Sequence, residues 1–151
     1  MQSIGRDHKL EMDKSVKCVI GESLVLAELL KRGHEAYIAH GPTQKGWDIA
    51  VIFNSGVKRV QVKTIGWPEK NQRTITVSNN LIFDYMIVVL LNLNQPHSRY
   101  LVCTKEEIES LLSAENPDRK NNSRSWYIPV DLNGNKQIIS LENAWLKIGN
   151  A

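Results

Sequence analysis

Three polar side chains, Asp48, Gln61 and Lys63, lie in two neighbouring segments that have the composition of β-strands. The segments, residues 48–53 and 58–65, are rich in β-branched residues. A charged group inside a sheet is costly unless it is paired or binds a ligand. The three side chains are therefore candidates for a catalytic or metal-binding site.

The expected pairing of the two segments brings these side chains together. Side chains alternate along a strand, so Gln61 and Lys63 share one face. If Ser55-Gly56 forms a two-residue turn, Lys63 lies opposite Asp48 and Gln61 lies opposite Ala50. A slip of one residue would separate them, so the prediction depends on the turn.

A predicted helix from Asp13 to Arg32 supplies a fourth candidate, Glu22. Glu22 lies in a stripe of otherwise apolar residues at helical spacing, Val19, Leu26 and Leu29. A carboxylate in that position is costly unless it is paired or ligated. Because this helix is expected to pack on the sheet, Glu22 is predicted to point towards Asp48. The alternatives are exposure to solvent or pairing with a base such as Lys31.

These residue types suit the hydrolysis of a phosphodiester, which needs a hard cation to neutralise the phosphate and activate water. Mg²⁺ prefers oxygen ligands. Asp48, the amide of Gln61 and the backbone carbonyl of Val62 can supply them, and Glu22 can bind a second ion or a metal-bound water. Lys63 can orient the attacking water or stabilise the charge of the transition state.

The order Glu22, Asp48, Gln61-Val62-Lys63 resembles the motif of the PD-(D/E)XK nuclease superfamily, with the resemblance covering about residues 16–112. It implies an α/β fold of the restriction-endonuclease type, a four-stranded mixed β-sheet flanked by helices, here with an extra C-terminal strand and helix. It also implies Mg²⁺-dependent DNA cleavage, in which Mn²⁺ could substitute. Asp48 and Gln61 would be metal ligands, Glu22 an accessory ligand and Lys63 the catalytic lysine.

The sequence departs from the family motif at two positions. Trp47 replaces a proline that is often absent from the superfamily, so this change matters little. Gln61 replaces the usual acid, which removes one negative charge and is expected to weaken metal binding. Glutamine occurs here in some active members, including intron-encoded homing endonucleases. This favours a site-specific, homing- or restriction-like endonuclease.

Each candidate residue also has a simpler interpretation. Asp48 could terminate a strand, and Lys63 could be an exposed lysine that discourages edge pairing. Among the basic residues of the predicted loops, three border the site segment and are predicted to contact DNA phosphates: Lys45, Lys70 and Arg73. Solvated loop charge is the alternative for these three. His40 could also reach the site.

The bulk properties predict one domain of 151 residues, with a core at about 13–112, a mobile loop at 113–125 and a C-terminal extension at 126–151. No apolar run is long enough to cross a bilayer, and no secretory signal is recognisable. Cys18 and Cys103 match no metal spacing and suit reduced, buried positions, so a cytoplasmic protein without membrane contact is expected. The net charge of +3 is compatible with a polyanionic partner.

Three functional hypotheses follow from these observations. The first is an Mg²⁺-dependent endonuclease for double-stranded or branched DNA, expected as a homodimer or homotetramer because a duplex has two strands to cut. A junction-resolving or repair nuclease is a variant of it. The second, supported by Gln61, is a nuclease-fold module that binds DNA or protein without cleavage. The third keeps the hydrolase but makes it an RNase or a toxin domain.

Overall fold

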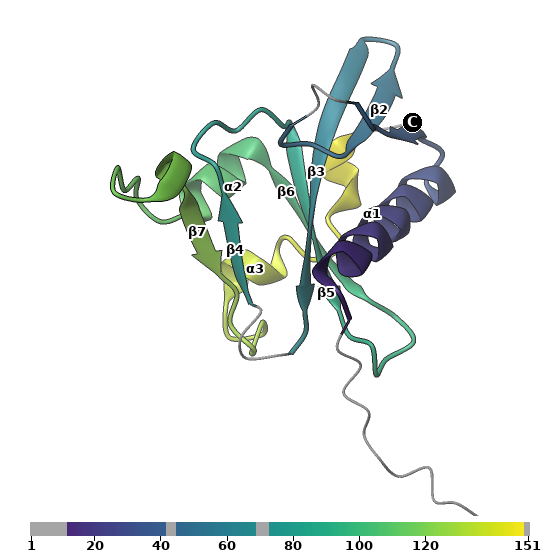
Figure 1. The fold of residues 1–151 in the computed structure, drawn as a ribbon. Helices are drawn as coiled ribbons and strands as arrows, with labels where there is room; N and C mark the ends of the chain where they lie inside the picture. Colours follow the sequence, from purple (N-terminus) through teal and green to yellow (C-terminus); the bar gives the residue numbers. More distant parts are fainter. Residues whose placement is uncertain (1–11, 42–44, 69–72, 150–151) are drawn as a thin grey trace, which may run out of the picture.

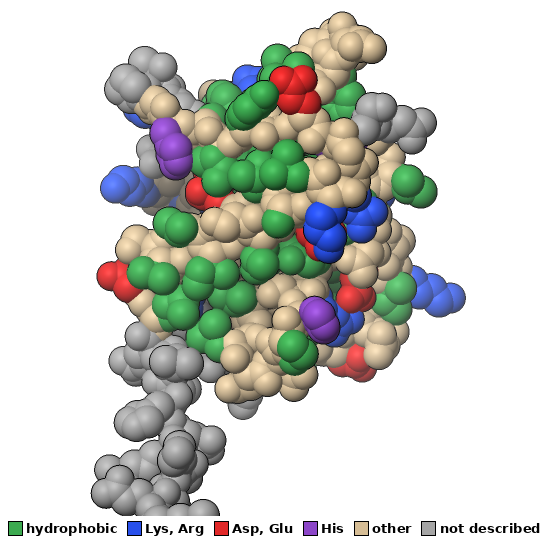
Figure 2. Space-filling model, turned by 90° about the vertical axis from the view of Figure 1, so that its right-hand side faces the viewer, with side chains coloured by type: hydrophobic (Ala, Val, Ile, Leu, Met, Phe, Trp, Pro, Cys, Tyr) green, Lys and Arg blue, Asp and Glu red, His purple; other side chains and the backbone are tan. Residues whose placement is uncertain are grey.

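The computed structural model describes residues 12–41, 45–68 and 73–149. Its largest helix is α1 (Lys14–Lys31), which begins where the Asp13 side chain accepts a hydrogen bond from the backbone N–H of Ser15. Helix α1 ends before Gly33, whose φ of 86° favours glycine. The predicted helix is thus confirmed. The inner face of α1 packs on the main sheet (Figure 1), and apolar side chains also gather on its solvent side, seen in Figure 2.

The main sheet has five strands in the order β1-β2-β3-β5-β6. Their bounds are β1 Glu35–Ile38, β2 Ile49–Phe53, β3 Gly56–Gly66, β5 Tyr85–Leu91 and β6 Arg99–Thr104. All neighbours are antiparallel except β3 and β5, which pair in parallel. The predicted mixed sheet is confirmed. It has one strand more than the expected four, because β1 pairs along the edge of β2.

The chain between β3 and β5 forms a strand that does not join this sheet. Strand β4 (Thr74–Val77) pairs in antiparallel fashion with β7 (Arg124–Tyr127), and we call this two-stranded sheet the β4–β7 ribbon. The ribbon covers the face of the main sheet opposite α1 (Figure 1). Because side chains alternate along β5, that strand contributes to both apolar cores, one under the ribbon and one under α1.

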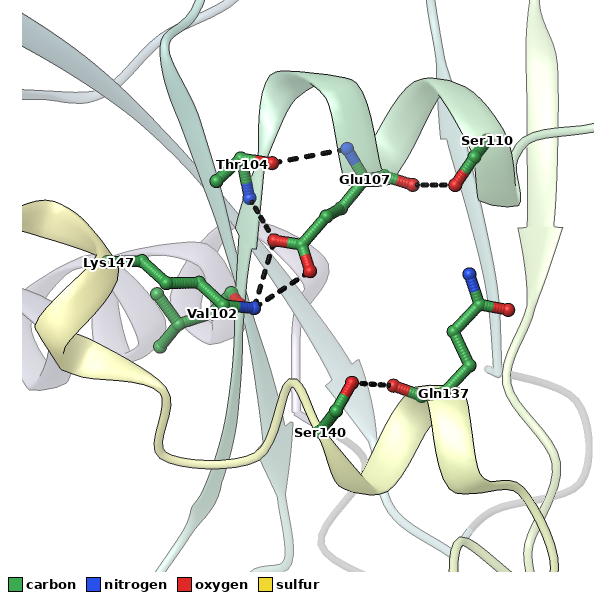
Figure 3. A network of polar contacts seen from close by, with 7 residues as sticks. All are labelled: Val102, Thr104, Glu107, Ser110, Gln137, Ser140 and Lys147. Atoms are coloured by element: carbon green, nitrogen blue, oxygen red, sulfur yellow. Dashed lines mark hydrogen bonds and ion pairs between the residues drawn. The ribbon is translucent and has the colours of Figure 1, made fainter.

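Helix α2 (Lys105–Leu111) begins with a capping box. Thr104 accepts from the Glu107 N–H at 3.2 Å, and the Glu107 carboxylate accepts from the Thr104 N–H at 3.0 Å, which completes a capping box. The same carboxylate accepts from Lys147 Nζ at 2.9 Å (Figure 3). Lys147 also donates to the Val102 carbonyl, so one lysine attaches the C-terminal segment to both α2 and β6.

The extra C-terminal helix predicted within residues 126–151 is not continuous. A short helix α3 (Lys136–Ile139) and a 3₁₀ helix η2 (Trp145–Ile148) replace it, because Asn143 has a φ of 53° and interrupts any continuous helix. Residues 113–125 contain a 3₁₀ turn, η1 (Lys120–Asn122). The Ser113 N–H donates to the Ser125 carbonyl, which joins the ends of this segment, and its mobility stays a prediction. None of the helices in the described ranges is both long enough and apolar enough to traverse a membrane.

Candidate active site

The hairpin of β2 and β3 pairs in a different register from the expected one. Phe53 lies opposite Gly56, so the turn residues are 54 and 55, and the predicted Ser55-Gly56 turn is wrong. Gly56 has a φ of 136°, a conformation that favours glycine, and it begins β3 instead of forming the turn. Ala50 is therefore opposite Arg59, not Gln61. The partner of each residue changes by two positions, which preserves the alternation of faces along β3.

Asp48 is held at the start of β2 by two backbone hydrogen bonds to β3. Its N–H donates to the Val60 carbonyl at 2.8 Å, although Val60 is the register partner of Ile49. Two consecutive residues thus face one, the arrangement of a β-bulge, which redirects a side chain at the edge of a ladder. The Val62 N–H then donates to Asp48 Oδ2 at 2.7 Å, so the carboxylate replaces a backbone acceptor.

Lys63 lies next to this carboxylate in β3. Burial lowers the pKa of the Lys63 ammonium, and the negative charge of Asp48 opposes that change. The N-terminal half of α1 also faces Lys63, because Cys18 and Lys14 are among its electrostatic neighbours. The interaction of Lys63 with Asp48 that the sequence predicted is therefore present, although the two residues are not cross-strand partners.

Glu22 reaches the same place from α1. Burial raises the pKa of the Glu22 carboxyl, and the neighbouring Asp48 raises it further as a negative charge and hydrogen-bond partner. His40, after β1, partly offsets these effects. The pKa of Asp48 is also raised, first by burial, against the opposing effects of the Val62 N–H, Lys63 and Glu22. The two carboxyl groups thus share a site that holds two negative charges only at a cost.

Helix α1 approaches β3 closely beside the site. A Cβ on Gly21 would collide with Thr64 Oγ1, and it would lie 3.0 Å from Thr64 Cβ. Gly21 precedes Glu22, and Thr64 follows Lys63, so this contact fixes the distance between α1 and β3 next to the site. The isolated glycine within an apolar helix was the sequence signal for it. Cys18, which was predicted to be buried, is exposed instead, while Cys103 is buried.

The oxygen donors here fit a magnesium ion. Gln61 stands between Val60 and Val62, the two residues bonded to Asp48, so its backbone is fixed close to that carboxylate. Asp48, Glu22, the Gln61 amide and the Val62 carbonyl would hold the ion, and all of them offer oxygen. Burial raises the pKa of both carboxyl groups, and a divalent cation bound to them would stabilise their charged forms. Within the described ranges, no group of three or more His, Cys, Asp and Glu residues forms a metal cluster, so the acidic part of this set is two carboxylates.

The three residues predicted to contact DNA differ in how the structure places them. Lys45 is exposed, three residues before Asp48. Lys70 lies outside the described residues. For Arg73 the alternative of solvated loop charge is wrong, because its exposed fraction is 6%, and its contact with DNA stays a prediction. Its guanidinium lies 5.3 Å from the centre of the Tyr127 ring, and its Nη2 donates to the Tyr127 hydroxyl at 2.7 Å.

Comparison with known proteins identifies the fold. No family model matches the sequence, and no curated protein matches it. The structure is similar to that of the bacterial homing endonuclease I-Ssp6803I, with 16% sequence identity, 91% of this chain and 93% of that chain covered, and a TM-score of 0.62. It is also similar to Hjc, a Holliday junction resolvase from the archaeal hyperthermophile Archaeoglobus fulgidus, with 14% identity, 89% and 98% coverage, and a TM-score of 0.52. Both are PD-(D/E)XK-like nucleases, so the predicted restriction-endonuclease-like fold is confirmed.

Proposed function

We propose that this protein is an Mg²⁺-dependent DNA endonuclease that hydrolyses phosphodiester bonds at specific sites, as homing or restriction enzymes do. The observation that carries the proposal is that Glu22 and Lys63 both lie next to Asp48 on a nuclease fold, with both carboxyl pKa values raised. A structural ion pair between Asp48 and Lys63 would need no second carboxylate beside it. Because Glu22 adds a second carboxylate beside Asp48, its presence favours a site that binds an added cation.

In hydrolysis, a water oxygen bonds to phosphorus, the phosphorus–oxygen bond to the leaving sugar breaks, and that sugar oxygen takes up a proton. A bound Mg²⁺ would supply charge neutralisation of the phosphate and a more acidic water. Asp48 is fixed for its role as a ligand by its two hydrogen bonds to β3. The partly desolvated Lys63 donates hydrogen bonds to the attacking water or to the phosphate oxygen that gains charge.

Two alternatives have specific support. The similarity to the junction resolvase Hjc favours a branched DNA substrate as the second candidate. The neutral Gln61 and the pair of carboxylates, in place of three, favour a module that binds DNA or protein without cutting. For an active enzyme on duplex DNA, a homodimer or homotetramer would bring two sites to the two strands.

A cleavage assay tests the proposal. Supercoiled plasmid and a four-way DNA junction are incubated with Mg²⁺, Mn²⁺ or EDTA and with wild type, Asp48→Ala or Lys63→Ala. Lys58→Ala is the matched control, because Lys58 is exposed in the same strand as Lys63. The proposal expects metal-dependent cutting by wild type and by the control, and its loss in both site variants. Cutting that persists in EDTA or in both site variants contradicts it, and preference for the junction selects the second candidate.

A further inference from the structure

In the described part of the chain, the outer face of the β4–β7 ribbon is polar and largely exposed. Its inward side chains, including Ile75, Val77 and Trp126, belong to the apolar core. Its outward side chains are Thr74, Thr76, Ser125 and Tyr127. Thr76 Oγ1 lies 3.3 Å from Ser125 Oγ, which in turn accepts from Arg119 Nη1 at 3.0 Å. Hydroxyl groups and a guanidinium thus form a continuous outer row.

We propose that this ribbon is the surface that lies in a groove of duplex DNA and reads its base edges. The inference rests on the proposed function and adds to it the part of the chain that recognises sequence. A ribbon of four residues per strand is about 13 Å long, and the major groove, about 12 Å wide, admits a two-stranded ribbon. Hydroxyl groups can donate and accept hydrogen bonds, so they can pair with both the acceptor and the donor groups of base edges.

The charge at the ribbon complements a phosphate backbone. Among the described residues, neither Arg73 nor Arg119 forms an ion pair with a carboxylate. Arg73 is nine-tenths buried under Tyr127, and its Nε and Nη1 have no hydrogen-bond partner within the described part of the chain. A buried cation without a counter-ion is costly, and a phosphate placed against Tyr127 would lower that cost.

The ribbon also lies in a suitable place relative to the site. Strand β4 ends at Val77, and the chain then reaches Ile82, whose side chain would be 3.1 Å from a Cβ on Gly46. Gly46 is two residues before Asp48, so one end of the ribbon connects to the loop that carries the catalytic aspartate (Figure 1). Trp47, in the same loop, packs on the apolar core beneath the ribbon. A duplex could therefore contact both at once.

Two measurements test the inference with Arg119→Ala and with the double variant Thr76→Ala/Ser125→Ala. The first is the binding of a fluorescein-labelled duplex of mixed sequence in EDTA over a range of salt. Arg119→Ala should reduce the slope of log K against log salt by about 1. The second is selection from a randomised duplex pool, where the hydroxyl variant should lose about tenfold discrimination at two or three adjacent positions.

Lys31→Ala is the control, because Lys31 is an exposed lysine of α1 on the other side of the sheet. Unfolding curves identify any variant that does not fold, and the outward positions of Thr76 and Ser125 make folding expected. If ribbon variants and Lys31→Ala behave alike while wild type binds and cuts DNA, only this inference is wrong. If wild type binds no duplex at all, the proposed function fails with it. Asp48→Asn should abolish cutting and still bind the mixed duplex.

Discussion

Gly21→Ala should destabilise the protein, although the same change normally strengthens a helix. In a helix interior, alanine in place of glycine gains about 0.5–1 kcal/mol. Here the new methyl group would collide with Thr64 Oγ1 and lie 3.0 Å from Thr64 Cβ, so α1 or β3 must move. Overpacking of this kind costs about 1–3 kcal/mol. The expected net loss is therefore about 1 kcal/mol and at most about 2.5 kcal/mol.

Urea unfolding of four proteins measures this loss: wild type, Gly21→Ala, Thr64→Ala and the double variant. Thr64→Ala removes Oγ1 and Cγ2, so it should remove at least half of the overpacking cost that Gly21→Ala introduces. The coupling free energy between the two substitutions should therefore be about 1 kcal/mol. Ser23→Ala, at an exposed position of the same helix, is the control and should be neutral or slightly stabilising. A Gly21→Ala protein that is more stable than wild type and additive with Thr64→Ala would refute the tight packing of α1 on β3.

Three other predictions concern charge. Burial lowers the pKa of His34 from its ordinary value of 6.5, so the unfolded chain binds more protons than the folded protein. The free energy of unfolding should therefore fall as the pH drops below about 6.5. His34→Gln should flatten this part of the stability–pH curve, and an unchanged curve would contradict the prediction. Arg99 lowers the pKa of Glu142 below 4.5 through hydrogen bonds of 2.7 and 2.8 Å. Glu142→Gln should therefore reduce the free energy of unfolding by about 1 kcal/mol at neutral pH, and by nothing once acid protonates the wild-type carboxylate. Urea unfolding at both pH values measures this difference. Gln61→Glu should lower the melting temperature without metal and increase the stabilisation that Mg²⁺ gives, whereas equal shifts in both proteins would place Gln61 outside the metal site.

The sequence predicted the elements well where local signals are strong. The helix predicted from Asp13 to Arg32 is α1, and the predicted segments 48–53 and 58–65 form β2 and most of β3. The placement of β4 was not predictable in the same way, because its pairing with β7 joins segments about 50 residues apart in the sequence. Local composition contains no information on that choice, and the separate ribbon emerged only in the structure.

The sequence proposed Glu22, Asp48 and Lys63 as neighbours, and the structure places Glu22 and Lys63 beside Asp48 by a route that the sequence did not predict. The carboxylate of Asp48 meets Lys63 through a bulge and a bond to the Val62 N–H, where simple alternation would have used cross-strand pairing. The burial of Arg73 was not predictable from the sequence, because a charged residue near a loop usually faces water. Here Arg73 is buried, and its guanidinium lies over the Tyr127 ring. Such tertiary contacts override the local preference of a residue.

Calorimetric titration with Mn²⁺ tests the central claim most directly, namely that Glu22 and Asp48 form a metal site beside Lys63. Wild type should show saturable binding, Asp48→Asn should lose it, and Lys63→Ala should retain or strengthen it, since a neighbouring positive charge is removed. A purely structural Asp48–Lys63 ion pair predicts a different result: no saturable binding to folded wild type, and similar destabilisation by both substitutions. That result would contradict the metal-dependent nuclease.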